Sequence, residues 1–207
     1  KLASQEKPVV SIEPYTFQAE YSIYVNNHLA ISQAVGYLRS LGHRRICFFF
    51  TPDANEAGGP MLERLEAFQK EVSAAGFDVA ATVKYIPLEG NLVEAGVKAA
   101  LEVLNSPERP TAILTCHDLY GIGALEAARR MEVRVPQELS VVGIDDIDWA
   151  SYTYPPLTTI EIPKEELGFA AASMLMGLIQ GKPCEQPLLR LPTRLIERGS
   201  AGSSTLV

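Results

Sequence analysis

The chain has 207 residues, of which 47% are hydrophobic, and this is enough apolar material for one large domain or two small ones. Its formal net charge is −7 at pH 7, so the polypeptide by itself is a poor candidate for binding the phosphate backbone of nucleic acids. No apolar run reaches the ~18 residues that a membrane span requires, and no signal peptide is expected in the opening residues KLASQEKPVV.

The three cysteines lie far apart in the sequence, at Cys47, Cys116 and Cys184. Two of them fall in apolar, strand-like runs, which indicates reduced, buried thiols and not a disulfide framework. No cysteine or histidine spacing typical of a zinc site occurs. We therefore expect a cytoplasmic protein with no metal and no cofactor.

Strand and helix patterns alternate along the chain. Near-continuous apolar runs bounded by turn residues predict strands at residues 8–12, 45–50, 111–116, 139–144 and 157–162, and a more polar run predicts another at 79–86. Apolar residues at helical spacing predict helices within residues 26–43, 60–76, 92–105, 118–131 and 163–181. This order predicts an α/β protein with a doubly wound, mostly parallel sheet sandwiched by helices.

Residues with strong end preferences mark the boundaries of these helices. Asn26 or Asn27 can cap the start of the first helix, and Gly42 can end it. Asp118 is expected at the N-cap of the fourth helix, and Gly181 is expected to end the last one.

Polar side chains follow the predicted strands where each strand ends. Glu13 follows the first strand, and Arg64 lies early in the helix that comes after the second. His117 and Asp145 follow two later strands. The strands of one parallel sheet end on the same side, so we expect these four side chains around one pocket. Carboxylates that accept and a guanidinium that donates suit a polar, neutral ligand with several hydroxyl groups.

These residues also have structural interpretations. Asp118 can cap its helix, and Arg64 can pair with a glutamate on its own helix. His117 and Cys116 are neighbours on a strand and point to opposite faces, so a catalytic Cys–His dyad is not expected. The run GIGALE lacks the third glycine of a dinucleotide fingerprint, and no GxSxG elbow or P-loop occurs.

Three blocks are specific in sequence and order: SLGHRRICFF at residues 40–49, RVPQELSVVGIDD at 134–146 and PPLTTI at 155–160. Together they resemble the effector-binding region of the lactose/galactose repressor (LacI/GalR) family of bacterial transcription regulators. The resemblance extends from PVVSIE, which begins at residue 8, to ERGS, which ends at residue 200. It implies a two-lobed, periplasmic-binding-protein-like fold with the effector between the lobes.

The resemblance also implies how the chain divides between the lobes. Residues 26–162 and 191–207 are expected to form a complete C-terminal lobe, and residues 1–25 and 163–190 part of the N-terminal lobe. The helix-turn-helix and the first units of the N-terminal lobe are expected to be absent from this chain. The remaining N-terminal pieces should then expose a strand edge and a helix face.

By the same resemblance, six positions bind the effector. The aspartate of the VVGxDD block matches Asp145, and the arginine of an RxxGF segment matches Arg64, although Ala67 replaces its glycine. The other four positions are Glu13, Val25, Asn91 and His117. His117 stands where the family commonly has asparagine, and this changes the donor and acceptor geometry at that position.

A homodimer is the second implication of the resemblance. Contacts are expected from the helix after EGN, from the start of the following helix and from the aromatic run WASYTY, at Leu92, Val97, Tyr120, Trp149, Tyr152 and Tyr154. The alternative is that Trp149 only covers the edge of the core.

The function implied is that of a sensor and dimerisation module that binds a small effector, most often a sugar in this family, and makes or breaks no bond. DNA would be bound only through a separate N-terminal domain, and no membrane partner is expected. One alternative is an extracytoplasmic sugar-binding protein of a transport system, which shares the fold. Another is an α/β enzyme that uses Asp145 and His117 as acid and base.

Overall fold

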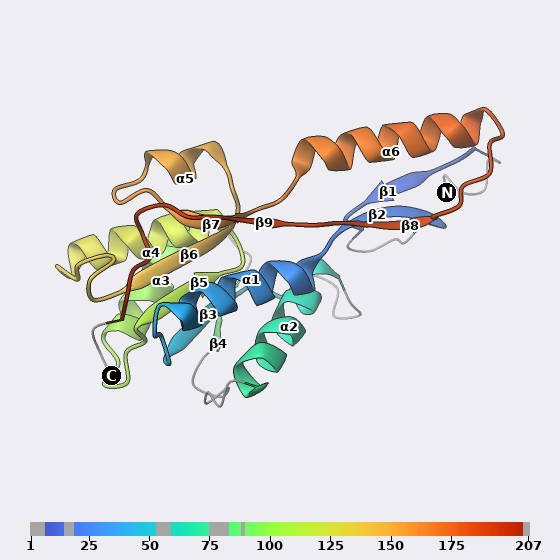
Figure 1. Cartoon of the computed structure of the whole chain (residues 1–207). Coiled ribbons are helices and arrows are strands. Elements are labelled where there is room, and N and C mark those ends of the chain that lie inside the picture. Colours follow the sequence, from blue (N-terminus) through green and yellow to red (C-terminus); the bar gives the residue numbers. More distant parts are fainter. Residues whose placement is uncertain (1–6, 15–18, 53–58, 75–82, 88–89, 205–207) are drawn as a thin grey trace.

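The computed structural model describes residues 7–14, 19–52, 59–74, 83–87 and 90–204. They form two units, each built on its own sheet, that lie end to end (Figure 1). The larger unit comprises a six-stranded sheet with helices α1 to α5, and the smaller unit comprises a three-stranded sheet with helix α6. Within these ranges, no helix has the length and apolar character needed to cross a membrane.

The larger sheet has the strand order β4-β3-β5-β6-β7-β9, and every neighbouring pair is parallel except β7 and β9. All residues of β3 and β5 are buried, as expected for parallel strands covered on both faces. The predicted doubly wound, mostly parallel α/β fold is therefore confirmed. The strands are β3 (Ile46–Phe50), β4 (Val83–Tyr85), β5 (Ala112–Thr115), β6 (Ser140–Asp145), β7 (Thr158–Glu161) and β9 (Arg194–Ile196).

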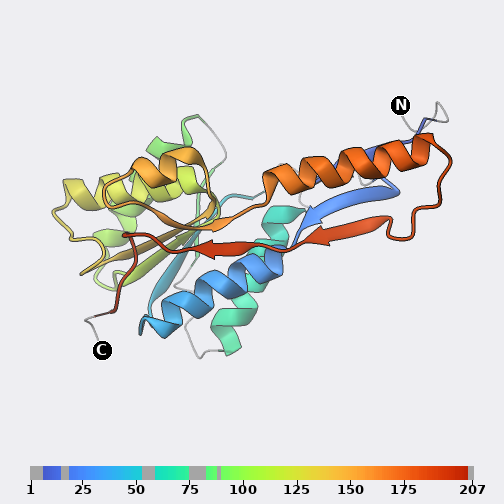
Figure 2. The ribbon, with the colours of Figure 1, turned by 45° about the horizontal axis from the view of Figure 1, so that its top comes forward.

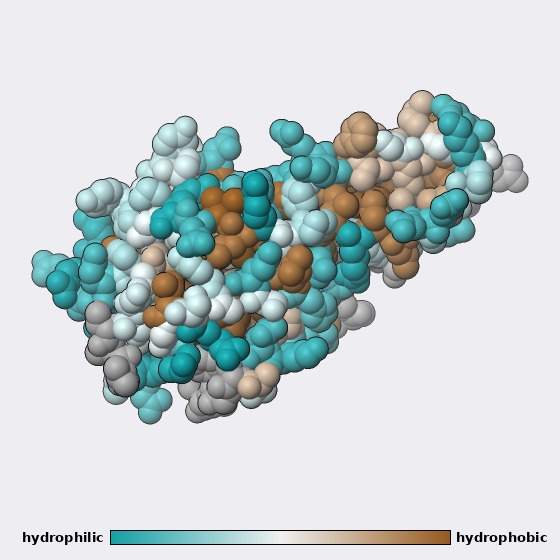
Figure 3. Space-filling view, viewed as in Figure 1, coloured by the Kyte–Doolittle hydropathy of each residue, from teal (hydrophilic) through white to brown (hydrophobic). Residues whose placement is uncertain are grey.

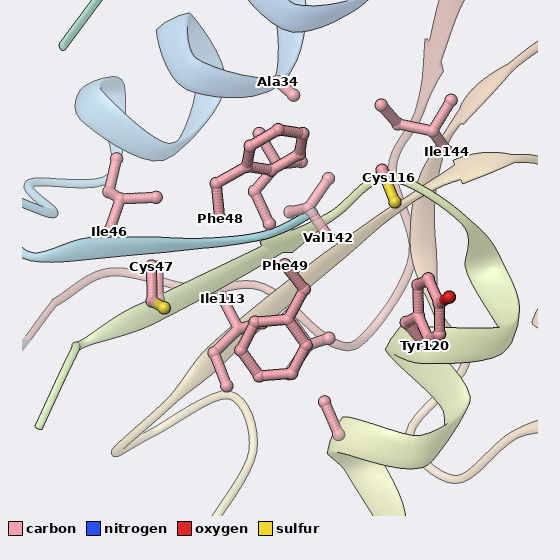
Figure 4. Close-up of a cluster of buried hydrophobic side chains, with 14 of the residues drawn as sticks. Ala34, Ile46, Cys47, Phe48, Phe49, Ile113, Cys116, Tyr120, Val142 and Ile144 are labelled. Atoms are coloured by element: carbon pink, nitrogen blue, oxygen red, sulfur yellow. The ribbon is translucent and has the colours of Figure 1, made fainter. Parts of the chain in front are cut away.

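Helices cover both faces of this sheet (Figure 2). Helices α1 and α2 lie on one face, and α3 and α4 lie on the other. Side chains alternate along β3, so that Phe48 points toward α1 while Cys47 and Phe49 point to the opposite face (Figure 4). The helices are α1 (Asn27–Ser40), α2 (Pro60–Ala74), α3 (Leu92–Leu104), α4 (Asp118–Arg130) and the short α5 (Asp148–Tyr152).

Glycines allow helices α3 and α4 to approach each other closely. A Cβ on Gly96 would lie 2.6 Å from the carbonyl oxygen of Tyr120, and a Cβ on Gly123 would lie 2.3 Å from that of Val93. Neither position has room for a side chain, so the two glycines set the distance between the helices. Gly123 belongs to the run GIGALE, and its role in the structure is helix packing.

The smaller unit contains the parallel strands β1 (Val10–Ile12), β2 (Tyr21–Val25) and β8 (Leu188–Leu191), in the order β1-β2-β8, and helix α6 (Lys164–Ile179) packs on β1 and β2. Its buried hydrophobic cluster is small and comprises Ile23, Val25, Leu167 and Ala171. Hydrophobic residues also gather at the surface of this unit (Figure 3). The large apolar side chains exposed on it include Ile12, Phe169, Met176, Ile179 and Leu188.

The chain passes between the two units three times within the described residues, from β2 to α1, from β7 to α6 and from β8 to β9. The first and last of these crossings are neighbours, because the backbone N–H of Asn26 donates to the carbonyl of Leu191 at 2.9 Å. Asn26 also caps α1, since its Oδ1 accepts from the N–H of Leu29 at 3.0 Å, as one of the two predicted alternatives required.

The sequence pattern did not predict every element of the structure. Strands β2, β8 and β9 and helix α5 were not predicted from the pattern. Of the strand predicted at 79–86, residues 79–82 lie outside the described ranges, and the observed strand is β4.

Candidate functional site

A buried arginine joins the ends of two strands in the larger unit. Arg64, in the first turns of α2, is only 2% exposed. Its Nη1 donates to the carbonyl of Cys116 at 2.5 Å, just after β5, and lies 4.0 Å from Oδ1 of Asp145, the last residue of β6. Its Nε donates to Oδ1 of Asn27 at 2.8 Å. One guanidinium therefore holds together the carboxyl ends of β5 and β6 and the start of α1.

His117 and Asp145 form the more open part of the same cluster. Nδ1 of His117 lies 3.1 Å from Oδ2 of Asp145, and each of the two side chains is 23% exposed. The rings of His117 and Tyr120 are 6.0 Å apart between centroids. The cluster thus has a buried cation in Arg64 and two partly open groups that a ligand can reach.

Glu13 and Val25 lie at the carboxyl ends of β1 and β2 in the smaller unit. The carboxylate of Glu13 accepts a hydrogen bond from the backbone N–H of Val25. Burial raises the pKa of Glu13, while the Val25 hydrogen bond and the charge of Arg64 act in the opposite direction without cancelling the rise. The charge of Arg64, in the larger unit, thus acts on Glu13, in the smaller unit.

An ion pair links the two units beside this cluster. Arg190, in β8, donates to both carboxylate oxygens of Glu63, in α2, at 2.9 and 3.1 Å. Nδ2 of Asn27 donates to the same carboxylate at 3.2 Å, and the Arg190 guanidinium lies 5.0 Å from the centre of the Tyr24 ring. Burial raises the pKa of Glu63, but the hydrogen bonds from Arg190 and Asn27 outweigh it and lower the pKa overall.

Three of these residues were missed by the sequence prediction. Asn27 was considered only as a cap, although its amide connects Arg64 to Glu63. Glu63 stands directly before Arg64, and this adjacency was a usable signal. Arg190 belongs to no motif, and its partner is 127 residues away in the sequence.

Asn91 has a different place in the structure. Its Oδ1 caps α3 by accepting from the N–H groups of Val93 and Glu94 at 2.9 and 3.3 Å. It also lines a surface hollow of about 350 Å³ with Lys84 and Tyr85, beside the edge strand β4. No described interaction joins it to the Arg64 cluster, so its contact with an effector stays a prediction.

The prediction for Asp118 was wrong. His117 is the N-cap residue of α4, and Asp118 is the first residue of the helix. Its carboxylate is fully buried and accepts from the N–H of Ile147 at 2.9 Å and from Oγ1 of Thr159 at 2.5 Å. Burial raises the pKa of Asp118 to about 6, although both hydrogen bonds oppose the rise. The carboxylate bonds to the turn after β6 and to β7.

The residues expected at a dimer interface divide into two groups. Trp149, Tyr152 and Tyr154 are 70, 80 and 97% exposed on and after α5. Leu92, at the start of α3, is partly exposed. By contrast, Val97 and Tyr120 are buried in the core of the larger unit, so their side chains do not form part of its surface.

The described part of the chain does not bring together the residues needed for metal or thiol chemistry. Within the described ranges, no group of three or more His, Cys, Asp or Glu side chains is arranged to hold a metal ion. The thiol of Cys116 is fully buried, and burial raises its pKa to about 12. A neutral, buried thiol beside His117 is unsuited to act as a nucleophile.

The model of one protein family, described as the periplasmic binding protein-like domain, matches residues 35–201. The chain belongs to this family.

The relatives named for this periplasmic binding protein-like chain are regulators. The ribose operon repressor of Escherichia coli (strain K12) is 33% identical over 196 residues, which cover 94% of the chain and 58% of the relative. A solved LacI-family regulatory protein from Chloroflexus aggregans has a TM-score of 0.86 at 28% identity, with 97% of this chain and 71% of that chain covered. A solved complex of the transcriptional regulator CelR with cellobiose has a TM-score of 0.81 at 30% identity, with 93% and 58% covered.

These findings confirm the resemblance to LacI/GalR regulators that the three sequence blocks indicated. The periplasmic binding protein-like chain spans about half the length of the curated relatives it matches.

Proposed function

We propose that this chain is the effector-sensing and dimerisation region of a LacI/GalR-type bacterial transcription regulator. The larger unit corresponds to the C-terminal lobe, and the smaller unit corresponds to part of the N-terminal lobe. A small, hydroxyl-rich metabolite of the sugar class binds where the strand ends of the two units face each other. DNA is bound by a helix-turn-helix outside this chain, and the effector is released chemically unchanged.

The observation that carries this proposal is the set of polar groups at the strand ends of both sheets. Asp145 and Glu13 offer carboxylates that accept from hydroxyl groups, and His117 offers a ring nitrogen. Arg64 is held in place by Asn27 and Cys116, so its position does not depend on a ligand. A rigid cation beside two partly open acceptors suits a neutral polyol better than an anion or an apolar ligand.

The names of two relatives support the sugar class. One is a ribose operon repressor, and another was solved as a complex with cellobiose. Both sugars are neutral and rich in hydroxyl groups, which is the chemistry that the Asp145 cluster fits.

Regulation follows from the arrangement of the two units. An effector that contacts both Glu13 and Asp145 favours one orientation of the smaller unit relative to the larger one. Such a ligand shifts the equilibrium only by its difference in affinity for the two orientations, typically ~1–3 kcal/mol. The Glu63–Arg190 ion pair joins the two units, so a change in their relative orientation must either preserve this contact or distort it.

The dimer surface that we propose centres on α5 and the residues after it. Trp149, Tyr152 and Tyr154 present large aromatic side chains to solvent, and aromatic residues are enriched where proteins associate. Leu92, at the start of α3, extends this surface.

Binding measurements test the proposal. Isothermal titration of the purified protein with D-ribose, cellobiose, nucleosides and sugar phosphates should identify at least one ligand. Asp145→Asn should weaken its binding by about tenfold, because one charged acceptor is lost. The matched control is Asp148→Asn at an exposed aspartate, the first residue of α5, which should change binding less than about twofold.

Two results would contradict the proposal. One is a panel in which no compound binds, together with no rise in the unfolding midpoint. The other is consumption of a bound compound that Asp145→Asn abolishes, since this is the behaviour of an enzyme. Recovery of the bound sugar intact, followed by proton NMR, is the expected outcome.

A further inference from the structure

The turn that carries Asp145 has an unfavourable backbone conformation. Asp145 and Asp146 are consecutive residues with positive φ, at 131° and 50°. Residues with a Cβ rarely adopt this region, and glycine is usually found there. Such a conformation persists only where the surrounding structure holds it.

The buried carboxylate of Asp118 holds this turn through both of its oxygens, one directly and the other through Thr159. Oδ2 of Asp118 accepts from the backbone N–H of Ile147 at 2.9 Å, directly after the two strained residues. Its Oδ1 accepts from Oγ1 of Thr159 at 2.5 Å, and the same oxygen of Thr159 accepts from the N–H of Asp146 at 3.4 Å. Asp118 is fully buried, so water does not compete for these bonds.

A glycine in the same strand makes room for this carboxylate. A Cβ on Gly143 would lie 2.1 Å from Oδ1 of Asp118. Gly143, the glycine of the VVGIDD block, is therefore needed to leave room for Asp118. Its backbone φ does not itself require glycine. Two other side chains also reach the turn. Arg198 donates to Oδ1 of Asp146 at 2.6 Å, and Lys164 donates to the carbonyls of Asp145 and Asp146.

The same carboxylate also holds the start of α5. Ile147 is the N-cap residue of this helix and has no side chain that can cap it. Its N–H bonds to Asp118, which lies at the start of α4. Helix α5 carries Trp149 and Tyr152, so the turn lies between the Arg64–His117–Asp145 cluster and the exposed aromatic surface.

We propose that Asp118 is a positioning residue that holds the β6–α5 turn in its strained form. It directs the Asp145 carboxylate toward Arg64 and His117 and, through Ile147, fixes the start of α5. Its effect on ligand binding rests on the function proposed above, whereas its effect on the turn does not. One buried group thereby couples the effector cluster to the proposed dimer surface.

Three substitutions separate positioning from general destabilisation. Asp118→Ala removes both acceptors. Asp118→Asn keeps a carbonyl oxygen for Ile147 and can donate to the hydroxyl of Thr159, so it is the conservative variant. The control is Val141→Ala. It removes buried atoms from β6, the strand that leads into the turn, and leaves the hydrogen bonds of the turn in place.

Trp149 is the only tryptophan of the chain and reports on α5 directly. Its fluorescence anisotropy should fall in Asp118→Ala and stay at the wild-type value in Asp118→Asn and Val141→Ala. Amide hydrogen exchange at Ile147 should become at least about tenfold faster in Asp118→Ala only. The dissociation constant for D-ribose or cellobiose should rise at least about tenfold in Asp118→Ala and stay within about threefold in the two other variants.

The outcomes distinguish this inference from the proposed function. If Asp118→Ala matches Val141→Ala in anisotropy and exchange, Asp118 has no positioning role, even if the sugar binds. If neither sugar binds the wild type but anisotropy and exchange respond as expected, the role of Asp118 in the turn stands and the sugar proposal fails. If Asp118→Ala does not fold, Thr159→Val replaces it. Thr159→Val keeps the shape, removes the link to Asp146, and must lower the Trp149 anisotropy for the inference to stand.

Discussion

Replacement of Arg64 by lysine measures how much the buried guanidinium contributes to the stability of the fold. Nε and Nη1 of Arg64 donate to acceptors on two different elements, Oδ1 of Asn27 at 2.8 Å and the carbonyl of Cys116 at 2.5 Å. A lysine ammonium is a single point charge and lacks the planar fork that reaches both acceptors. In Arg64→Lys, one buried acceptor should therefore lose its partner.

The size of the loss follows from this geometry. A hydrogen bond to a charged group contributes ~1.5–3 kcal/mol, and a buried acceptor left unpaired costs ~1–3 kcal/mol. Both figures describe the loss of the same bond, so they are not added. We expect the free energy of unfolding of Arg64→Lys to fall by about 2–3 kcal/mol. For a chain of 207 residues this corresponds to a decrease in Tm of about 4–12 °C.

Urea denaturation followed by far-UV circular dichroism, without ligand, gives the unfolding free energy of each variant. The control is Arg129→Lys, because Arg129 has a side chain that is 71% exposed and pairs with Glu126 on the surface of α4. Its effect on the free energy of unfolding should be much smaller than that of Arg64→Lys, because water surrounds the exposed pair. If Arg64→Lys is no more destabilising than Arg129→Lys, the bonds of the buried guanidinium contribute nothing net, and the reasoning is refuted.

Three further predictions concern the larger unit and the thiols. Burial lowers the pKa of His43, so the folded protein takes up a proton less readily than the unfolded chain. Below about pH 6.5, the unfolding free energy of the wild type should fall relative to that of His43→Gln in urea titrations, and parallel profiles would contradict this. Gly123→Ala places a Cβ 2.3 Å from a backbone oxygen of α3 and should lower the unfolding free energy by at least about 2 kcal/mol. Gly168→Ala meets no atom within 4 Å and should raise it by about 0.5–1 kcal/mol, so a similar effect of both changes would exclude the helix-contact explanation. Burial raises the pKa of the two buried cysteine thiols to about 12, so a thiol-specific aromatic disulfide should modify Cys184 alone in the native chain. Rapid modification of a second thiol before unfolding would show that the core is open.

The strands of the larger sheet other than β9 could be predicted because their signal is local. The five residues of β3, Ile46–Phe50, are all buried, so the strand is a continuous apolar run in the sequence. Strands β2 and β8 lack such a run, because the smaller unit does not bury the whole of either strand. Helix α5 has five residues, which is too short to show a helical period.

The positions of Arg64, His117 and Asp145 could be inferred from a topological rule. Each follows a strand of one parallel sheet, and the carboxyl ends of such strands lie on one side. The structure brings these three side chains into contact. Glu13 lies on a different sheet, which the rule for a single sheet does not describe.

The sequence by itself determined the order of the strands and helices from α1 to β7, with the exception of α5, and the end of the larger sheet at which polar residues gather. These features depend on periodicity and on strand direction, which are local properties. Only the tertiary structure decided which partners the polar groups take. Asp118 could cap its own helix or bond elsewhere, and Glu63 could pair along α2 or across to Arg190. The local sequence allows both alternatives at each residue, so the choice depends on which groups the packing of distant elements buries together.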